Sequence, residues 1–331
     1  MILSYHKIPK TQVCTILCHT TLLDTMKKEE VSMEHHDALK VVQKGALPIP
    51  VGTPAGDSLA ILAVSRALNM FTEWETSERM EHWNNVAVWK DGPDKGRIRY
   101  VQFFMFKTME EIPFEIQYLT AAEEIVFYSN ANHFLRNLDT GEHITKLTNL
   151  KRLTIGAYGL TSLHPDFKNL KNLEYLDLSS NCFQTIPDIL TQENFPNLHA
   201  LVLNANQRHT IYDLSNDIRE NVGGFIDEPK FPERILKWNK LDTIRLSVNY
   251  LQGELPKMLD HEKWTAEEVQ ANDTLPDVLI GLPKVLPDTE FFAINYNRLT
   301  GEIPEWLLFH PKLDIWYPFS LVFSQEGKTR D

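Results

Sequence analysis

Leu173-Glu-Tyr-Leu176-Asp-Leu178-Ser-Ser-Asn181-Cys-Phe183 decides the fold of this chain, because the same spacing stands earlier in Leu150-Lys-Arg-Leu153-Thr-Ile155-Gly-Ala-Tyr-Gly-Leu160. Apolar and polar residues alternate at the centre of each copy. Successive side chains of a strand point to opposite faces, so each copy predicts a short strand with one buried face. Asn181 follows the strand, where its amide can donate to and accept from backbone groups that a turn leaves unpaired.

Apolar side chains return to the same interior after the turn, at Phe183, Ile186 and Ile189. Such a coil has one apolar edge that it cannot cover alone, so it must stack against further coils. The sequence supplies them, with first apolar positions at Ile98, Ala122, Leu150, Leu173, Leu198, Leu241, Thr289 and Leu313. Two late copies carry the longer pattern N-x-L-x-G-x-[IL]-P, at Asn249 to Pro256 and Asn297 to Pro304. The stretch from Ile112-Pro113 to Leu119-Thr120, with Asn130 further on, echoes this pattern.

This recurrence resembles the leucine-rich repeat family, in the plant-type variety of about 24 residues per repeat that occurs in plant receptors and in bacterial surface and effector proteins. The resemblance covers about residues 98–321. It implies an α/β fold, a curved solenoid with a parallel sheet on the concave face and irregular or helical segments on the convex face. The stretches that begin at Ile98, Leu173 and Leu241 should then lie side by side in one sheet.

The chain divides into three predicted parts. Residues 1–48 contain no repeat, and residues 98–331 form the repeat domain. Residues 49–97 are expected to form a linker and a helical, tryptophan-rich cap. Residues 48–56 are rich in proline and glycine, which predicts the linker, and Asp57-Ser58 can cap a helix that follows. Trp83-Asn-Asn-Val86 and Gly96-Arg97-Ile98 resemble the cap of plant-type repeats.

Plant caps usually carry paired cysteines, and this stretch has none, so we expect aromatic packing alone to hold the cap, as in bacterial members of the family. Two intervals are longer than one coil and indicate insertions near 207–240 and 257–288. Each is either a lengthened coil or a binding loop, since insertions in repeat arrays map to loops on one face. The second could also be a degraded helical repeat. Residues 316–323 are a candidate closing cap, unless the chain is a fragment of a longer protein.

Composition excludes several function classes. The net charge of −12, from 45 acidic and 33 basic residues, argues against phosphate backbones or anionic membranes as partners. No apolar run approaches the roughly 20 residues that span a bilayer. Three cysteines are too few and too scattered for a disulfide framework, and Cys182 reads as a small buried thiol. The apolar residues 13–18 suggest either a weak signal peptide or an unstructured start.

The sequence contains none of the common motifs of hydrolases (G-x-S-x-G), nucleotide binders (P-loop, G-x-G-x-x-G) or zinc sites (H-E-x-x-H, C-x-x-C…C-x-x-C). We therefore assign no catalytic, cofactor-binding or metal-binding residue and expect no cofactor and no enzyme. The outward positions of the predicted strands remain, and aromatic and arginine side chains dominate binding hot spots. The candidate ligand-binding residues at these positions are Tyr100, Phe104, Tyr128, Arg152, Tyr175, Asp177, Arg245 and Phe291.

The resemblance implies an interaction module, monomeric and placed at the cell surface or secreted, often in bacteria. The predicted function is non-catalytic binding of a protein, peptide or glycan on the concave face, with no nucleic acid and no membrane insertion. The alternative is that the array is the recognition half of a larger enzyme or effector whose catalytic domain lies outside this chain. Fold analogy does not name the ligand.

Overall fold

The computed structural model describes residues 50–70, 74, 78–106, 111–129, 138–206, 209–213, 218–222, 225, 228 and 230–313. Within these ranges the dominant element is an eight-stranded sheet in the order β1-β2-β3-β4-β5-β6-β9-β11. All neighbouring strands are parallel except the first pair. The strands are β1 (Val86–Val88), β2 (Ile98–Phe106), β3 (Glu124–Ser129), β4 (Arg152–Gly156), β5 (Tyr175–Asp177), β6 (Ala200–Val202), β9 (Thr243–Arg245) and β11 (Phe291–Ala293).

Register confirms the alignment of the repeats. The second apolar position of each copy pairs with the same position of the next copy across the whole sheet, and these residues are all buried: Val101, Ile125, Leu153, Leu176, Leu201, Ile244 and Phe292. The predicted leucine-rich repeat solenoid is therefore correct, including the adjacency in one sheet of the stretches that begin at Ile98, Leu173 and Leu241.

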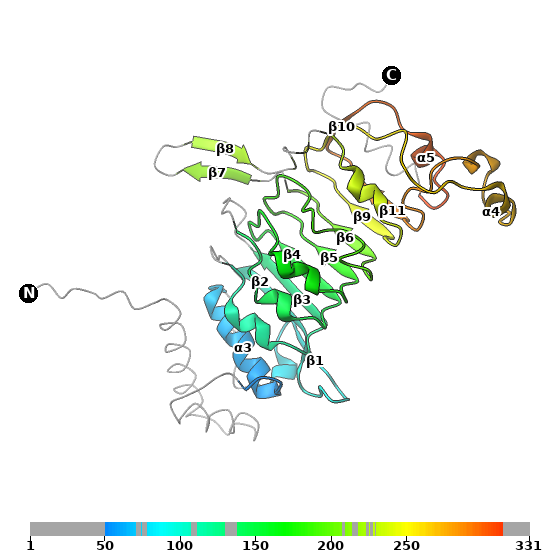
Figure 1. The fold of residues 1–331 in the computed structure, drawn as a ribbon. Helices are drawn as coiled ribbons and strands as arrows, with labels where there is room; N and C mark the ends of the chain where they lie inside the picture. Colours follow the sequence, from blue (N-terminus) through cyan, green and yellow to red (C-terminus); the bar gives the residue numbers. More distant parts are fainter. Residues whose placement is uncertain are drawn as a thin grey trace, which may run out of the picture.

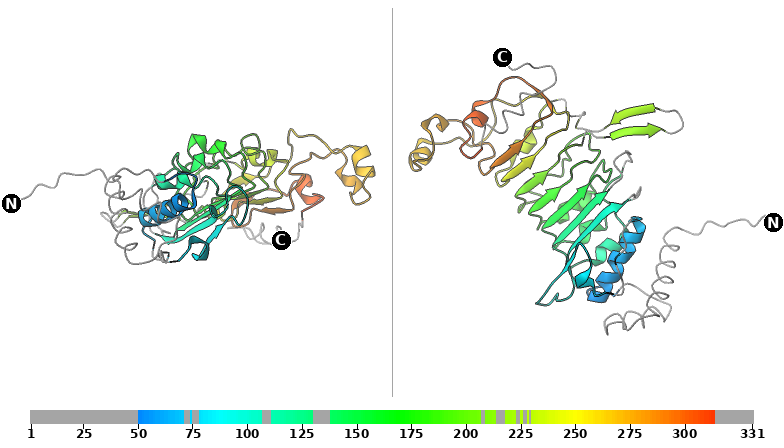
Figure 2. Two further views of the ribbon diagram at one scale, coloured as in Figure 1. Left: turned by 90° about the horizontal axis from the view of Figure 1, so that it is seen from below. Right: turned by 180° about the vertical axis from the view of Figure 1, so that it is seen from behind.

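Short 3-10 segments occupy the face opposite the sheet (Figures 1 and 2). They are η2 (Phe114–Tyr118), η3 (Ile144–Lys146), η4 (Pro165–Asn169) and η5 (Glu233–Lys237). One continuous apolar core runs between the two faces, and each 3-10 segment contributes to it a residue that is 0% exposed: Ile116, Ile144, Phe167 and Ile235. Phe183, Ile186 and Cys182 are buried as predicted, whereas Ile189 is only partly buried.

Helix α3 (Pro54–Ala67) covers the open edge of the first coil. The predicted linker extends three residues too far, because the helix begins at Pro54. The predicted cap at Asp57-Ser58 is wrong, because Thr53 caps the helix by accepting from the Gly56 N–H at 3.0 Å. Proline is tolerated in the first turn of a helix, where its missing N–H has no partner to lose. A Cβ on Gly56 would lie 2.0 Å from the Pro50 carbonyl oxygen, so this turn requires glycine.

Asp57 has a different role from the predicted cap. Its carboxylate is fully buried and accepts from Arg97 at 3.1 Å and from the Ile98 N–H at 2.9 Å, which ties α3 to the start of β2. Burial raises the pKa of Asp57, while the hydrogen bonds from Ile98 and Arg97 oppose that shift. The cap is therefore not held by aromatic packing alone, although Trp74 does stack on Trp83 with ring centroids 5.9 Å apart.

Buried asparagines join successive coils on the side of the strand ends. The Oδ1 atom of Asn181 accepts from three N–H groups of the preceding coil, those of Tyr158, Gly159 and Leu160. Its Nδ2 donates to the Ile155 carbonyl at 2.6 Å and to its own strand at Leu178. Asn249 and Asn297 repeat this arrangement further along the array. These contacts confirm the turn role predicted for Asn181, and Asn130 lies outside the described residues.

Neither insertion adds a strand to the main sheet, because β9 pairs directly with both β6 and β11. The first insertion contains an antiparallel hairpin, β7 (His209–Asp213) and β8 (Ile218–Val222), and the second contains α4 (Ala266–Gln270) and η6 (Asp277–Leu279). The two project from opposite edges of the array (Figures 1 and 2). The second insertion is therefore a lateral extension of one coil, in agreement with the prediction of a lengthened coil, and not a separate degraded repeat.

The last described coil ends with α5 (Glu305–Leu308), next to a small parallel sheet of β10 (Gln252–Glu254) and β12 (Arg298–Thr300). The two copies of N-x-L-x-G-x-[IL]-P supply these strands. His310 closes the coil: its Nδ1 accepts from the N–H groups of Lys312 and Leu313, both at 3.2 Å, and its Nε2 lies 3.0 Å from the Leu286 carbonyl oxygen. Residues 1–48, with Cys14 and Cys18, and residues 316–323 lie outside the described ranges.

Asn181→Ala should lower the free energy of unfolding by about 1–3 kcal/mol, because several buried backbone groups lose their partners at once. Asn172→Ala is the matched control, since the amide of Asn172 is exposed and donates only to the Thr148 carbonyl at 2.9 Å. Chemical denaturation of both variants measures the difference. An unchanged midpoint for Asn181→Ala would contradict the role of the asparagines.

Acid should weaken the closing coil through His310. Burial lowers the pKa of His310 below its ordinary 6.5, so the unfolded chain takes up the proton more readily than the folded one. The stability that the neutral ring provides is therefore complete above pH 6.5 and is lost as the pH falls below that value. His310→Gln should flatten the pH dependence of unfolding in this window. Chemical denaturation of both proteins, wild type and variant, at a series of pH values measures this slope, and an unchanged slope in His310→Gln would contradict the role of His310.

Candidate functional site

The side of the eight-stranded sheet that faces away from the 3-10 segments carries the outward positions of every repeat, and we call it the open sheet face. Register arranges its side chains in rows that cross the strands. The first row is Tyr100, Glu124, Arg152, Tyr175, Ala200, Thr243 and Phe291. The second is Gln102, Val126, Thr154, Asp177, Val202, Arg245 and Ala293. All eight candidate residues lie on this face, with Phe104 and Tyr128 one step further along β2 and β3.

An aromatic patch stands at the end of β2 and β3. Phe104 and Tyr128 are each 40% exposed, and their ring centroids are 6.3 Å apart. Gly156 on β4 makes room for the tyrosine, because a Cβ there would lie 2.8 Å from the Tyr128 ring. Met105 is an extra residue in the register between β2 and β3, with a positive φ of 53°, and it is 41% exposed. Sequence analysis did not identify Met105, because a bulge leaves no mark on the apolar alternation.

Arginine and tyrosine pack against each other at the centre of the face. The Cζ of Arg152 lies 4.2 Å from the Tyr175 ring centroid, and its Nε lies 3.4 Å from Glu124 Oε1. The Tyr175 hydroxyl donates to Asp177 Oδ2 at 3.3 Å, and Asp177 Oδ1 accepts from the Ser179 N–H at 2.8 Å and from the Ser179 hydroxyl. Burial, and then the Asp177 charge, raise the pKa of Tyr175, so the phenol remains neutral and able to donate at physiological pH.

The third part of the face lies over β9 and β11. The exposed Arg245 holds its Cζ 4.8 Å from the Phe291 ring centroid. Its neighbours in the same row are Val202 and Ala293, which offer no charge. Ser247 lies beyond Arg245 and hydrogen-bonds through its hydroxyl to Asn295. The structure therefore divides the candidates into an aromatic patch, an arginine–tyrosine–aspartate centre and an arginine–phenylalanine end, with Tyr100 set apart near Gln102.

The kinds of side chain on the open sheet face determine what it can bind. Among the described residues, no three histidine, cysteine or carboxylate side chains are grouped so that they could hold a metal ion. The residues of the open sheet face instead offer aromatic surface, hydrogen-bond donors and guanidinium groups. These are the means by which a protein surface binds another molecule.

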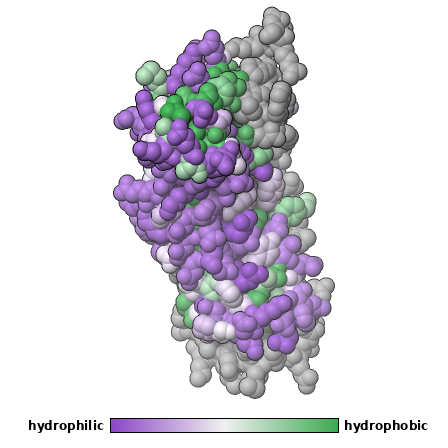
Figure 3. Space-filling model, turned by 90° about the vertical axis from the view of Figure 1, so that its right-hand side faces the viewer, coloured by the Kyte–Doolittle hydropathy of each residue, from purple (hydrophilic) through white to green (hydrophobic). Residues whose placement is uncertain are grey.

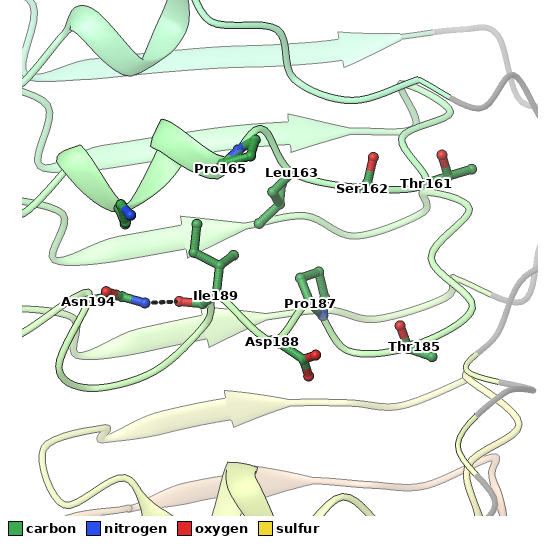
Figure 4. Close-up of a pocket in the computed structure, with 10 residues that line it drawn as sticks. Thr161, Ser162, Leu163, Pro165, Thr185, Pro187, Asp188, Ile189 and Asn194 are labelled. Atoms are coloured by element: carbon green, nitrogen blue, oxygen red, sulfur yellow. Dashed lines mark hydrogen bonds between the residues drawn. The ribbon is translucent and has the colours of Figure 1, made fainter.

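An open pocket of about 520 Å³ lies on the opposite face, between two neighbouring coils (Figure 4). Its walls come from two matching stretches: Thr161, Ser162, Leu163 and Pro165 from one coil, and Thr185, Pro187, Asp188 and Ile189 from the next. The amide of Asn194 donates to the Ile189 carbonyl at 2.9 Å and fixes one end of the pocket. Lys168 also contributes to the lining, so hydroxyl, proline and aliphatic groups share this pocket with one basic and one acidic side chain, Lys168 and Asp188.

The end of the array that carries α4 is mostly hydrophilic, with a gathering of hydrophobic residues in the upper part of the view in Figure 3. The exposed apolar residues of the last coils are Met258, Val278, Ile280, Tyr296 and Leu308. Lys284 holds the second insertion together through ion pairs with Glu262 at 3.1 Å and Glu268 at 2.5 Å. The pKa of Glu268 is lowered to about 2, chiefly by its hydrogen bond from Lys284.

Comparison with known proteins agrees with the repeats. The leucine rich repeat family model matches residues 148–207, which include β4, β5 and β6. The chain is a leucine-rich repeat protein. A curated relative, receptor-like protein 39 of Arabidopsis thaliana, is 28% identical over 277 aligned residues, which cover 59% of this chain. The match spans only 30% of the length of that relative.

The chain also has some similarity to two solved structures. A plant ice-binding protein is 18% identical with a TM-score of 0.41, covering 75% of this chain and 81% of that chain. The leucine-rich repeat ectodomain of the Arabidopsis receptor kinase HAESA, in complex with an extended IDA peptide hormone, is 20% identical with a TM-score of 0.38, covering 64% and 32%. Among the described residues, no helix has both the length and the apolar character needed to cross a bilayer.

Gly156→Ala should displace the Tyr128 ring without unfolding the repeat, because φ is not positive at this position and the ring can swing toward solvent. We expect a change in unfolding free energy of about 1 kcal/mol or less, together with shifted NMR signals of the Tyr128 ring. Ring signals identical to those of wild type would contradict the contact between Gly156 and Tyr128.

Proposed function

We propose that this leucine-rich repeat protein is a non-catalytic binding module that holds an extended segment of a protein or peptide on its open sheet face. The single observation that carries this proposal is the exposed aromatic pair Phe104 and Tyr128 on that face. Large apolar side chains at 40% exposure lose contact with water when a partner covers them, and each buried aromatic contributes strongly to binding. A protein chain supplies the apolar side chains that would cover this patch.

Rigidity of the face supports the same function. The strands are paired on both sides, the rows are fixed by register, and Tyr175 and Asp177 are held by hydrogen bonds within the face. A surface that is already ordered loses little conformational entropy on binding, which favours affinity. The HAESA complex named above contains a peptide hormone. For this chain we propose a ligand of the same general kind, a peptide or a segment of a protein.

Placement at the cell surface or in the extracellular space is part of the proposal. The match to a plant receptor-like protein supports it, whereas the bacterial origin expected from the cap remains a prediction. We propose a monomer, since a ligand that crosses the rows needs only one copy of the face. The second candidate function, recognition for a catalytic domain elsewhere in a larger protein, is supported by the limited share of the relative that this chain covers.

Replacing Tyr128 or Tyr175 by alanine should weaken ligand binding at least about tenfold, as expected for hot-spot residues. The ligand is first captured from extracellular proteins and peptides, and a glycan array is probed in parallel with the same protein. Phe114→Ala is the matched control, because Phe114 is an exposed aromatic in η2 on the opposite face. Retention of full binding by both tyrosine variants, or loss of binding by Phe114→Ala alone, would reject the open sheet face. Binding only on the glycan array would reject a polypeptide ligand.

A further inference from the structure

In the described part of the chain, Arg245 has no carboxylate partner, unlike several other cationic side chains near the sheet. Arg97 pairs with Asp57, Lys151 with Glu123 at 2.7 Å, and Arg152 contacts Glu124. Arg245 is exposed, and no described carboxylate lies within 4 Å of it. On the open sheet face, Arg152 contacts Glu124, whereas Arg245 has no acidic side chain paired with it among the described residues.

Surrounding residues hold Arg245 ready for a partner from outside. The Phe291 ring centroid lies 4.8 Å from the Arg245 Cζ, a cation–π contact that holds the guanidinium beside the ring. The row neighbours Val202 and Ala293 are small and apolar, so a ligand group can approach along the sheet without meeting a charge. Asp177, the next carboxylate along the row, belongs to a strand two positions away, with a backbone separation of roughly 10 Å, and its oxygens already accept from Ser179 and Tyr175.

We propose that Arg245 and Phe291 form a subsite for a carboxylate side chain, an aspartate or glutamate of the bound polypeptide. This inference rests on the proposed function and names the chemistry of its ligand. A planar guanidinium donates two parallel hydrogen bonds to a carboxylate, which a neutral amide cannot match. The Phe291 ring shields the guanidinium and the bound carboxylate from water, which strengthens their electrostatic attraction.

The position of the subsite also sets a spacing on the ligand. Tyr128 lies on β3 and Arg245 on β9, four strand spacings apart in the sheet order, which corresponds to roughly 19 Å. An extended peptide covers that distance with about six residues. The ligand should therefore carry an acidic residue on Arg245 and an apolar or aromatic residue about six positions away, over Phe104 and Tyr128.

Positional-scanning libraries of synthetic decapeptides test the subsite. The libraries are prepared once with amidated and once with free C-termini, and peptide retention by the intact chain is measured. Wild type should retain amidated pools with Asp or Glu at one position at least about tenfold better than the matching Asn or Gln pools. Arg245→Gln should abolish this preference, and Arg245→Lys should reduce it, because lysine keeps the charge without the planar fork.

Arg298→Gln is the control, since Arg298 stacks on Tyr250 with its Cζ 4.1 Å from the ring centroid but lies in β12, outside the open sheet face. It removes the same charge and should keep the acidic preference. Retention of peptides without any acidic preference, or a preference that survives Arg245→Gln in a folded variant, overturns the subsite alone. Acidic preference seen only with free C-termini assigns the carboxylate to the chain end and also overturns it. No retention of any pool overturns peptide binding itself.

Discussion

This array depends on buried side-chain amides that join one coil to the coil before it, at Asn181, Asn249 and Asn297. A coil turns sharply at the end of its strand, and the turn leaves backbone N–H and C=O groups buried without partners of their own. One asparagine such as Asn181 satisfies groups on two coils at once, because a single amide both donates and accepts. Without it, the turn would bury unpaired polar groups at a cost that the short strands could not offset.

The same contact explains why the fold could be predicted from the sequence. Leu176 and Leu178 must alternate to face the core, and the asparagine must follow at a fixed distance to reach the preceding coil. The outward rows could therefore be assigned before the structure was known, and the candidates from Tyr100 to Phe291 all lie on one face. Contacts at a distance in the sequence were not predictable. Asp57 meets Arg97 and Ile98 only because α3 packs on the first coil, and no local pattern announces that pairing.

Local chemistry misled the prediction at the start of the cap. Proline and glycine between residues 50 and 56 have the composition of a linker, yet Pro54 and Gly56 form the first turn of α3. Glycine is present because the backbone of Pro50 passes directly over the helix, a close approach that only tertiary structure creates. The lack of a described carboxylate beside Arg245 was equally unpredictable, since the sequence shows which side chains face outward but not which of them contact an opposite charge.

Strand pairing in the main sheet does not depend on how many residues connect two neighbouring strands. β6, β9 and β11 are immediate neighbours although far more residues separate them than separate β4 from β5. The geometry of the rows is thus decoupled from the two projecting segments, which leave and rejoin the solenoid at its edges. Protein engineers could accordingly exchange residues 209–222 or 258–284 for foreign loops, and such a chimera would keep the same recognition surface while presenting a second activity beside it.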